Sequence, residues 1–337
     1  MVERDSRIGV RRVAGKIGAS IRGVNLRELG ELGDPGSSGA VGEIRAALLR
    51  HKVLFFREQR LDHVGHVAFA RLFGEVTRLP GPRHGTHPEG FPEILIVDRQ
   101  AAGGRRGPGF EERLYRTSDR HDSGWHVDIA SSVNPPAISI LRCEVAPEYG
   151  GDTQWTNLVA AYEGLSRPLQ RLADGLRAEH ALHAGVRLLF SDDEDLAVIR
   201  KRAEDTLISL HPVVRVHPET GQKALFLPPA SVSHLAGLLP WESRGILDVF
   251  FSHLCRPEYT VRHRWEPGDI AVWDNRAVAH LQPADLHHTD YERRMFRVLV
   301  HGDRPVGPDG FHSESVRGAP LRPLTGRGDA DSGTAPE

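Results

Sequence analysis

The sequence AISILRCEV, residues 137–145, is an apolar run of strand length and the first of a series. A short continuous apolar run bounded by turn residues is typical of a buried strand. Helical patterns in this part of the chain are confined to 158–165 and 245–254. The pattern predicts a mainly β sandwich or barrel with flanking helices. Further strand-like runs, separated by turns rich in Gly, Pro and Asp, lie at 213–217, 224–227, 259–265, 270–273 and 296–300.

The N-terminal part predicts both kinds of element. Residues 12–25 alternate in short pieces, which indicates strands and turns, and the apolar run at 53–56 predicts a buried central strand. A helix is expected over 43–51, where the apolar residues share one face. A second helix is expected to begin after Asp62, as its N-cap, and to end near Gly74.

Composition excludes several classes of protein. The 337 residues include 43 Lys and Arg against 45 Asp and Glu, a net charge of −2, so the basic excess of a nucleic-acid-binding protein is missing. No apolar stretch approaches the roughly 20 residues that span a bilayer. The charged first residues lack the apolar segment of a signal peptide. We therefore expect a cytoplasmic enzyme without a nucleic-acid or membrane partner.

We expect one domain over residues 1–305 and a flexible C-terminal tail over 306–337, which is rich in Gly and Pro. Residues 100–124 are rich in Gly and Arg and show no periodicity. A long insertion of this kind is usually either disordered or functional, and its place before the richest motif makes it a candidate lid. Cys143 and Cys255 are too few for a disulfide framework and are expected to be buried thiols.

Residues 125–128, WHVD, carry the main chemical motif. Side chains two residues apart on an extended segment point to the same side, so His126 presents an imidazole beside the carboxylate of Asp128. One further histidine would complete a 2-His-1-carboxylate triad, which leaves positions on Fe(II) open for oxygen chemistry. Among 19 histidines a single His-x-Asp pair also occurs by chance, so its meaning depends on the motifs elsewhere.

Several separated motifs together resemble the taurine dioxygenase / TfdA family of Fe(II)- and 2-oxoglutarate-dependent oxygenases, which includes alkylsulfatases. The resemblance extends from about residue 12 to about residue 305. It implies a double-stranded β-helix, or jelly roll, with flanking α-helices. In chain order the motifs are His126-x-Asp128, GGDT at 150–153, HPVVR at 211–215, PGD at 267–269, WDNR at 273–276 with His280, Arg293 to Arg297, and GD at 302–303.

The resemblance also implies roles for individual residues. His126, Asp128 and His280 match the iron ligands at the catalytic centre. Arg293, helped by the hydroxyl of Thr153, matches the anchor for the far carboxylate of 2-oxoglutarate. The arginine four residues later, Arg297 in this chain, faces the anionic group of the primary substrate. Arginine suits both tasks because its planar guanidinium binds a carboxylate in a bidentate manner and stays charged.

Other histidines compete for the third ligand position. His287, His288 and His301 lie near His280 in the chain. A lone histidine is more often a hydrogen-bonded structural residue than a ligand. The WDNR motif sets the register of His280, which is therefore the expected ligand.

Departures from the family pattern bear on the substrate. Leu79 and Pro82 stand where taurine dioxygenase has a histidine and a tyrosine that contact taurine, which argues against taurine. Asp122 aligns with the asparagine before the Trp-His motif and is a candidate substrate contact. The neighbouring His121 either lines the entrance or is a solvated loop residue.

We therefore expect an Fe(II)- and 2-oxoglutarate-dependent dioxygenase that uses dioxygen to hydroxylate an unactivated C–H bond, with decarboxylation of 2-oxoglutarate to succinate. The expected substrate is small and anionic: a sulfate ester, sulfonate, carboxylate or phosphonate. The alternatives are a metal-dependent hydrolase with the same His/Asp/His site and a non-catalytic anion-binding β-sandwich. Neither explains a second anion anchor beside the triad. By family analogy the protein forms a homo-oligomer, a dimer or a tetramer.

Overall fold

The computed structural model describes residues 8–32, 39–77, 87–98, 124–181, 207–282, 285 and 291–324. An eight-stranded sheet runs through its middle, and strands distant in sequence are neighbours in it. Only β2 and β3 pair in parallel in this sheet. In order its strands are β1 (Gly9–Arg12), β2 (Ala19–Arg22), β3 (Val53–Phe56), β14 (Ile270–Asp274), β6 (Ile138–Val145), β16 (Arg294–Val300) and β4 (Val76–Thr77), with β5 (Ile94–Asp98) also paired to β16.

A second sheet faces one side of the first. It contains β13 (Thr260–His263), β7 (Thr153–Asn157) and β15 (Val278–Leu281). Three tryptophans fill the space between the sheets, with Trp155 packed edge-on against Trp273 at 5.7 Å and close to Trp265 at 6.4 Å between ring centroids. Burial of such large rings contributes several kcal/mol and holds the two sheets in a fixed relation. The predicted mainly β jelly roll is therefore confirmed.

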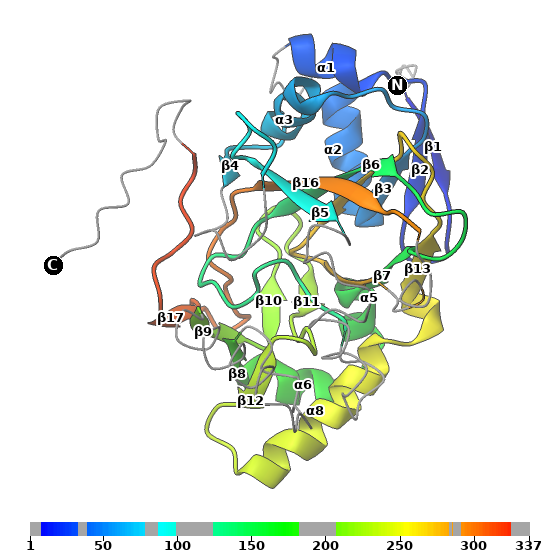
Figure 1. Ribbon diagram of the computed structural model, residues 1–337. Coiled ribbons are helices and arrows are strands. Elements are labelled where there is room, and N and C mark those ends of the chain that lie inside the picture. Colours follow the sequence, from blue (N-terminus) through cyan, green and yellow to red (C-terminus); the bar gives the residue numbers. More distant parts are fainter. Residues whose placement is uncertain are drawn as a thin grey trace, which may run out of the picture.

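Helices α1 (Leu26–Leu32), α2 (Ala40–His51) and α3 (His63–Arg71) cover the other side of the large sheet (Figure 1). Alternation along each strand makes this two-sided packing possible: Val272 faces the helices and Trp273 faces the second sheet. Asp62 caps α3 as predicted, because its Oδ1 accepts a hydrogen bond of 2.7 Å from the amide of Gly65. No helix of the described residues is long and apolar enough to cross a membrane.

The remaining elements form a separate layer at the opposite end of the molecule (Figure 1). Their apolar side chains build a core of their own around Phe250 and Leu225. This layer contains α5 (Leu158–Glu163), α6 (Arg167–Gly175), α8 (Pro240–Leu254), the short helix η2 (Pro257–Tyr259) and the strands β8 (Arg177–Ala181), β9 (Ile208–Pro212), β10 (Val214–Val216), β11 (Lys223–Leu225) and β12 (Val232–Leu235).

Two expectations need correction. The flexible tail does not begin at residue 306, because β17 (Glu314–Arg317) pairs with β9 and Leu321 is buried. This segment escaped prediction because backbone hydrogen bonds hold it while its strand is exposed and polar. Cys143 is buried as expected, whereas Cys255 is only half-buried. Of the predicted insertion at 100–124, only Gly124 lies within the described residues.

Three histidines of the described residues, His66, His180 and His211, are 0% exposed, and two of them make hydrogen bonds to backbone carbonyls. The ring of His66 on α3 lies with Nε2 3.3 Å from the carbonyl of Ile140. The ring of His211 on β9 bonds to the hydroxyl of Ser313 and the carbonyl of Ala130. Burial lowers the pKa of each of these two histidines to about 3, so both stay neutral where an unfolded chain would bind protons.

We predict that these histidines make the fold acid-sensitive. Because their folded pKa values lie below the unfolded value of about 6.5, their contribution is complete above that pH and is lost as the pH falls towards 3. Between pH 7 and pH 5, each should lower the free energy of unfolding by about 2 kcal/mol. Urea unfolding of His66→Gln should show a difference between the two pH values that is smaller by this amount. The exposed His312→Gln is the control and should keep the wild-type difference.

Candidate metal centre

The two histidines of the predicted triad are joined through their backbones. The amide of His126 donates to the carbonyl of His280 at 2.9 Å, and the amide of His280 donates back at 2.7 Å. His280 lies on β15, beside the tryptophan core, and its ring is tilted against Trp273 at 4.8 Å. The imidazole rings of the two histidines are 4.0 Å apart. These two hydrogen bonds therefore hold the segment around His126 beside β15, although the two are distant in sequence.

Asp128 follows in a tight turn rather than in a continued strand. The amide of Ala130 donates to the carbonyl of Val127 at 3.2 Å, and Ile129 adopts a φ of 46°. A β-branched residue rarely adopts this left-handed conformation, which indicates local strain. The expectation of an extended segment therefore holds at His126 and fails at Asp128, although both side chains still reach the same place.

One nitrogen or oxygen from each of His126, Asp128 and His280 can be chosen so that all three atoms lie within 4.8 Å of one another. His126 Nδ1 lies 3.0 Å from the carbonyl of Gly124, which favours a proton on Nδ1 and leaves Nε2 as a ligand. Nδ1 of His280 is buried without a hydrogen-bond partner within the described part of the chain. Two imidazoles and one carboxylate gathered in this way are the ligand set that suits Fe(II).

Electrostatics keep these groups in the states that a metal needs. Burial lowers the pKa of His280 well below its usual range, so its imidazole is neutral. Burial alone would raise the pKa of Asp128. The charge of Arg297, the two histidines and the Ser139 hydroxyl outweigh it and lower the pKa to about 2. The carboxylate is therefore ionised, as metal coordination requires.

Of the competing histidines, His301 is structural. Its Nε2 lies 3.1 Å from the carbonyl of Leu321 and 3.2 Å from the side-chain amide of Asn134, away from the triad. Within the described residues, the cluster of His126, Asp128 and His280 is the one group of three that could hold a metal ion. His287, His288, Asp122, His121, Leu79 and Pro82 lie outside the described residues.

Arg293 lies close to the segment that carries Thr153, because its guanidinium contacts Gly151, two residues before that threonine. Gly150 and Gly151 both have positive φ, and this left-handed turn presents the carbonyl of Gly151 to Arg293 Nε at 2.9 Å. Arg293 is buried, and its hydrogen-bond partner among the described residues is this carbonyl rather than a carboxylate. Burial lowers its pKa to about 10, which leaves it charged at neutral pH.

The hydroxyl of Thr153 has an additional partner that the sequence did not indicate. Thr153 Oγ1 accepts a hydrogen bond of 2.9 Å from the indole of Trp265. Because an indole can only donate, the hydroxyl keeps its own proton free to donate to an anion. Trp265 stood out in the sequence only as the end of a strand-like run, and nothing in that run marked this role.

Arg297 forms an ion pair with Asp128, one of the three candidate metal ligands. Its Nη1 lies 2.5 Å from Asp128 Oδ1, and its buried Nε has no hydrogen-bond partner in the described part of the structure. Arg297 and Met295 project from the same side of β16, facing the second sheet. Arg297 thus contacts the triad through Asp128. That the guanidinium of Arg293, four residues earlier, lies on the same face beside the triad stays a prediction.

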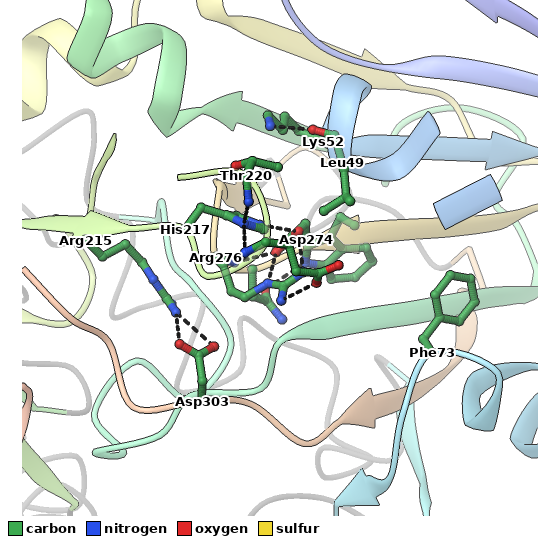
Figure 2. Close-up of polar contacts among 12 residues, drawn as sticks. Leu49, Lys52, Phe73, Arg215, His217, Thr220, Asp274, Arg276 and Asp303 are labelled. Carbon is green, nitrogen blue, oxygen red and sulfur yellow. Dashed lines mark hydrogen bonds and ion pairs between the residues drawn. The ribbon is translucent and has the colours of Figure 1, made fainter. Parts of the chain in front are cut away.

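Buried charged side chains surround Asp274 and Arg276 of the WDNR motif. Asp274 accepts hydrogen bonds from Arg276 Nε at 2.8 Å and from His217 Nε2 at 2.9 Å (Figure 2). Burial alone would raise the pKa of Asp274, but Arg276 and His217 hold it well below its usual range. Arg276 also pairs with Glu219 at 2.7 Å. Two charges buried with matched partners avoid the large penalty of an unpaired one.

Two further motifs meet beside this network. Arg215, from the HPVVR motif, donates from Nη2 to both oxygens of Asp303 at 3.1 and 3.0 Å (Figure 2). The preceding Gly302 has no room for a side chain, since a Cβ there would lie 1.8 Å from the carbonyl of Pro135. The GD motif therefore packs the chain after β16 tightly against the segment before β6.

A jelly roll that brings two histidines and a carboxylate together has the architecture of a non-haem iron oxygenase. The chain belongs to the family described as "Taurine catabolism dioxygenase TauD, TfdA family", which it matches over residues 9–299. It is an Fe(II)- and 2-oxoglutarate-dependent dioxygenase, as predicted. The hydrolase and the non-catalytic β-sandwich are set aside.

Individual relatives cover almost the whole chain. An alpha-ketoglutarate-dependent sulfate ester dioxygenase from Pseudomonas putida is 38% identical over 92% of this chain and 95% of its own. An alkylsulfatase from Acinetobacter baylyi is 33% identical over 91% of this chain and 89% of its own. The crystal structure of a taurine dioxygenase from Burkholderia xenovorans superposes with a TM-score of 0.75 at 40% identity, covering 93% of this chain and 96% of that one.

We predict that His280 and His301 differ sharply in metal binding. His280→Ala removes one of three clustered ligand atoms, so it should weaken Fe(II) binding by more than the roughly 10- to 100-fold typical of losing a supporting contact. His301→Ala removes only a bond to a backbone carbonyl and a side-chain amide, and should bind Fe(II) as the wild type does. Anaerobic calorimetric titration measures both. Equal binding by the two variants would contradict the placement of the centre.

Proposed function

We propose that this dioxygenase oxidises alkyl sulfate esters and thereby releases sulfate. The observation that carries the proposal is the position of Arg297, an anion-binding side chain directly beside the His/Asp/His cluster. Support for the sulfate ester comes from the names of the relatives from P. putida and A. baylyi.

We assign His126, Asp128 and His280 as the ligands of Fe(II). The bound iron, with 2-oxoglutarate and dioxygen, supplies the oxidising power that replaces a C–H bond by C–OH, while 2-oxoglutarate is converted to succinate and carbon dioxide. The chain's own residues hold the ligands at one end of the barrel and keep the carboxylate ionised. Burial of Asp128 and His280 also limits the access of water to this end.

Arg293 and Thr153 are assigned to the far carboxylate of 2-oxoglutarate. Arg293 offers a charged guanidinium with no carboxylate partner in the described structure, and Thr153 offers a hydroxyl proton. A buried cation without an ion pair is costly, which favours the arrival of an anion at this position. Both side chains are already oriented, Arg293 by Gly151 and Thr153 by Trp265, so binding loses little conformational entropy.

Arg297 is assigned to the sulfate group of the substrate. Its unpartnered Nε can donate to an anion while Nη1 remains near Asp128. The same side of the sheet carries a small aliphatic cluster, with Leu95 directly across from Arg297 and Leu299 two residues further on. Ile129 and Val97 pack against it. An anion anchor beside an aliphatic wall suits an alkyl sulfate better than a short, doubly polar molecule such as taurine.

The chemistry of release follows from the position of attack. Hydroxylation of the carbon that bears the ester oxygen gives an unstable hemiacetal-like sulfate. Cleavage of its C–O bond to sulfate leaves an aldehyde. The balanced reaction consumes alkyl sulfate, 2-oxoglutarate and dioxygen and yields aldehyde, sulfate, succinate and carbon dioxide.

Succinate formation tests the proposal on a panel of alkyl sulfates, alkyl sulfonates, aryloxy acids and phosphonates of matched chain length. We expect the alkyl sulfates to give the highest kcat/KM, with sulfate released in equal amount to succinate. A panel in which a sulfonate or an aryloxy acid is preferred would overturn the substrate assignment and leave the reaction class intact. The homo-oligomer and the cytoplasmic location stay predictions.

We predict separate effects for the three arginines around β16. Arg293→Ala should raise the KM for 2-oxoglutarate by about 10- to 100-fold, because hydrogen bonds to charged groups are worth about 1.5–3 kcal/mol. Arg297→Ala should raise the KM for the alkyl sulfate by a similar factor. Arg294→Ala is the control, since Arg294 pairs with Asp98 and Glu292 outside the site. Exchanged phenotypes for Arg293 and Arg297 would reverse the two assignments.

A further inference from the structure

A line of three hydrogen bonds connects Asp128 with the WDNR motif. Trp273 Nε1 donates to Asn275 Oδ1 at 2.9 Å, Asn275 Nδ2 donates to Ser139 Oγ at 2.7 Å, and Ser139 Oγ donates to Asp128 Oδ2 at 2.5 Å. Ser139 and Asn275 are 0% exposed, Trp273 1% and Asp128 3%. Because the four side chains are buried, water cannot replace any of these hydrogen bonds unless the surrounding structure rearranges.

The chemistry of the first donor, the indole of Trp273, sets the donor-to-acceptor direction of all three hydrogen bonds. An indole N–H can only donate, so Trp273 requires the oxygen of the Asn275 amide on its side and turns the NH₂ group towards Ser139. The Ser139 oxygen already accepts from this NH₂ group, and its own proton points to Asp128. Asp128 therefore receives a neutral hydrogen bond from the protein interior on Oδ2.

The two oxygens of Asp128 consequently have different surroundings. Oδ2 is bound to the buried Ser139. Oδ1 lies 3.7 Å from His280 Nε2 and contacts Arg297, whose side chain remains 17% exposed. Fixing one oxygen from the interior limits rotation of the carboxylate about its Cβ–Cγ bond. The other oxygen then faces the imidazole of His280, where the candidate metal site is.

Strand register brings these residues together. Ser139 on β6 is paired directly with Trp273 on β14, and the amide of Asn275 donates to the carbonyl of Ala137 at 2.9 Å. The alternate residues Asp274 and Arg276 bind each other, and Asp274 also accepts a hydrogen bond from His217 (Figure 2). The motif therefore has two sides: residues 274 and 276 anchor it, and residues 273 and 275 support the metal site.

We propose that Ser139 and Asn275 are positioning residues of the metal centre, which orient the Asp128 carboxylate so that Oδ1 faces the metal. This inference rests on the assignment of Asp128 as a ligand made under the proposed function. Neither residue touches substrate or cofactor in this arrangement. Both act through Asp128, and their contribution is a carboxylate that is oriented before the metal arrives.

Metal binding to the full-length chain tests the proposal without turnover. Mn(II) serves as the probe, and free Mn(II) is followed by electron paramagnetic resonance. Ser139→Ala should weaken Mn(II) binding by roughly 10- to 100-fold, the usual cost of a lost supporting contact. Ser139→Thr, which keeps the hydroxyl, should restore most of the affinity. Asn275→Ala leaves the Ser139 proton in place but unoriented and should cause a smaller loss, of a few fold.

Ser243→Ala is the matched control, because Ser243 is a buried serine on α8 whose hydroxyl accepts from the amide of Leu235, outside this site. It should lower the urea midpoint and leave Mn(II) affinity unchanged. Wild-type affinity in Ser139→Ala, or equal losses in Ser139→Ala and Ser243→Ala, would overturn the proposal. Wild-type affinity in Asp128→Ala would instead overturn the ligand assignment under the proposed function.

A second readout separates orientation from simple structural damage. With Fe(II) and 2-oxoglutarate in the absence of oxygen, the chelate gives a weak visible charge-transfer band. Ser139→Ala should shift or weaken this band at saturating metal while the dissociation constant of 2-oxoglutarate stays near the wild-type value, because Arg293 and Thr153 are untouched. An unchanged band at full occupancy would count against a role in orienting the carboxylate.

Discussion

The structure of the centre depends on a pair of backbone hydrogen bonds between His126 and His280. These two bonds, of 2.9 and 2.7 Å, form an isolated bridge: His280 belongs to the ladder of β15 with β7, whereas His126 belongs to no named strand. They join a segment that is otherwise in turns to a strand of the second sheet. Because the amides and carbonyls set the distance between the two main chains, the imidazoles lie close together before any metal binds. The side chains therefore need only small adjustments to share one ion.

Buried charge surrounds this bridge, and almost all of it is compensated in pairs. Asp274 is balanced by Arg276 and His217, and Arg215 by Asp303. Two of the cations near the metal centre keep a capacity to bind an anion. Within the described residues Arg293 has a carbonyl as its hydrogen-bond partner, and Arg297, although ion-paired with Asp128, keeps a buried Nε without an acceptor. Because a buried donor or cation without a partner is unfavourable, these two side chains favour the binding of an anion, whereas the fully paired charges stabilise the fold. Affinity for ligands and stability of the fold are thus assigned to different side chains.

The sequence allowed the prediction of what depends on local pattern. The strand at 53–56, the cap at Asp62 and the triad followed from periodicity or from motifs in order. Contacts across the sheets were not predictable in this way. Ser139 lies in an ordinary strand pattern, and its bond to Asp128 depends on the register between β6 and β14. Arg215 and Asp303 were each noted as parts of motifs, yet nothing in either motif indicated that they form a pair. The segment after residue 306 was missed because its pairing uses main-chain atoms.

The ordered segment after residue 306 has a consequence for biosynthesis. Asn134, in the turn region that follows Asp128, makes two hydrogen bonds with the backbone of Leu321: its Nδ2 donates to the carbonyl at 3.0 Å, and its Oδ1 accepts from the amide at 2.8 Å. The hydroxyl of Ser313 forms a hydrogen bond with the ring of His211. The ribosome makes Leu321 187 residues after Asn134. The hydrogen bonds between Asn134 and Leu321 can therefore form only after residue 321 has been synthesised, when every named strand of the eight-stranded sheet already exists as sequence.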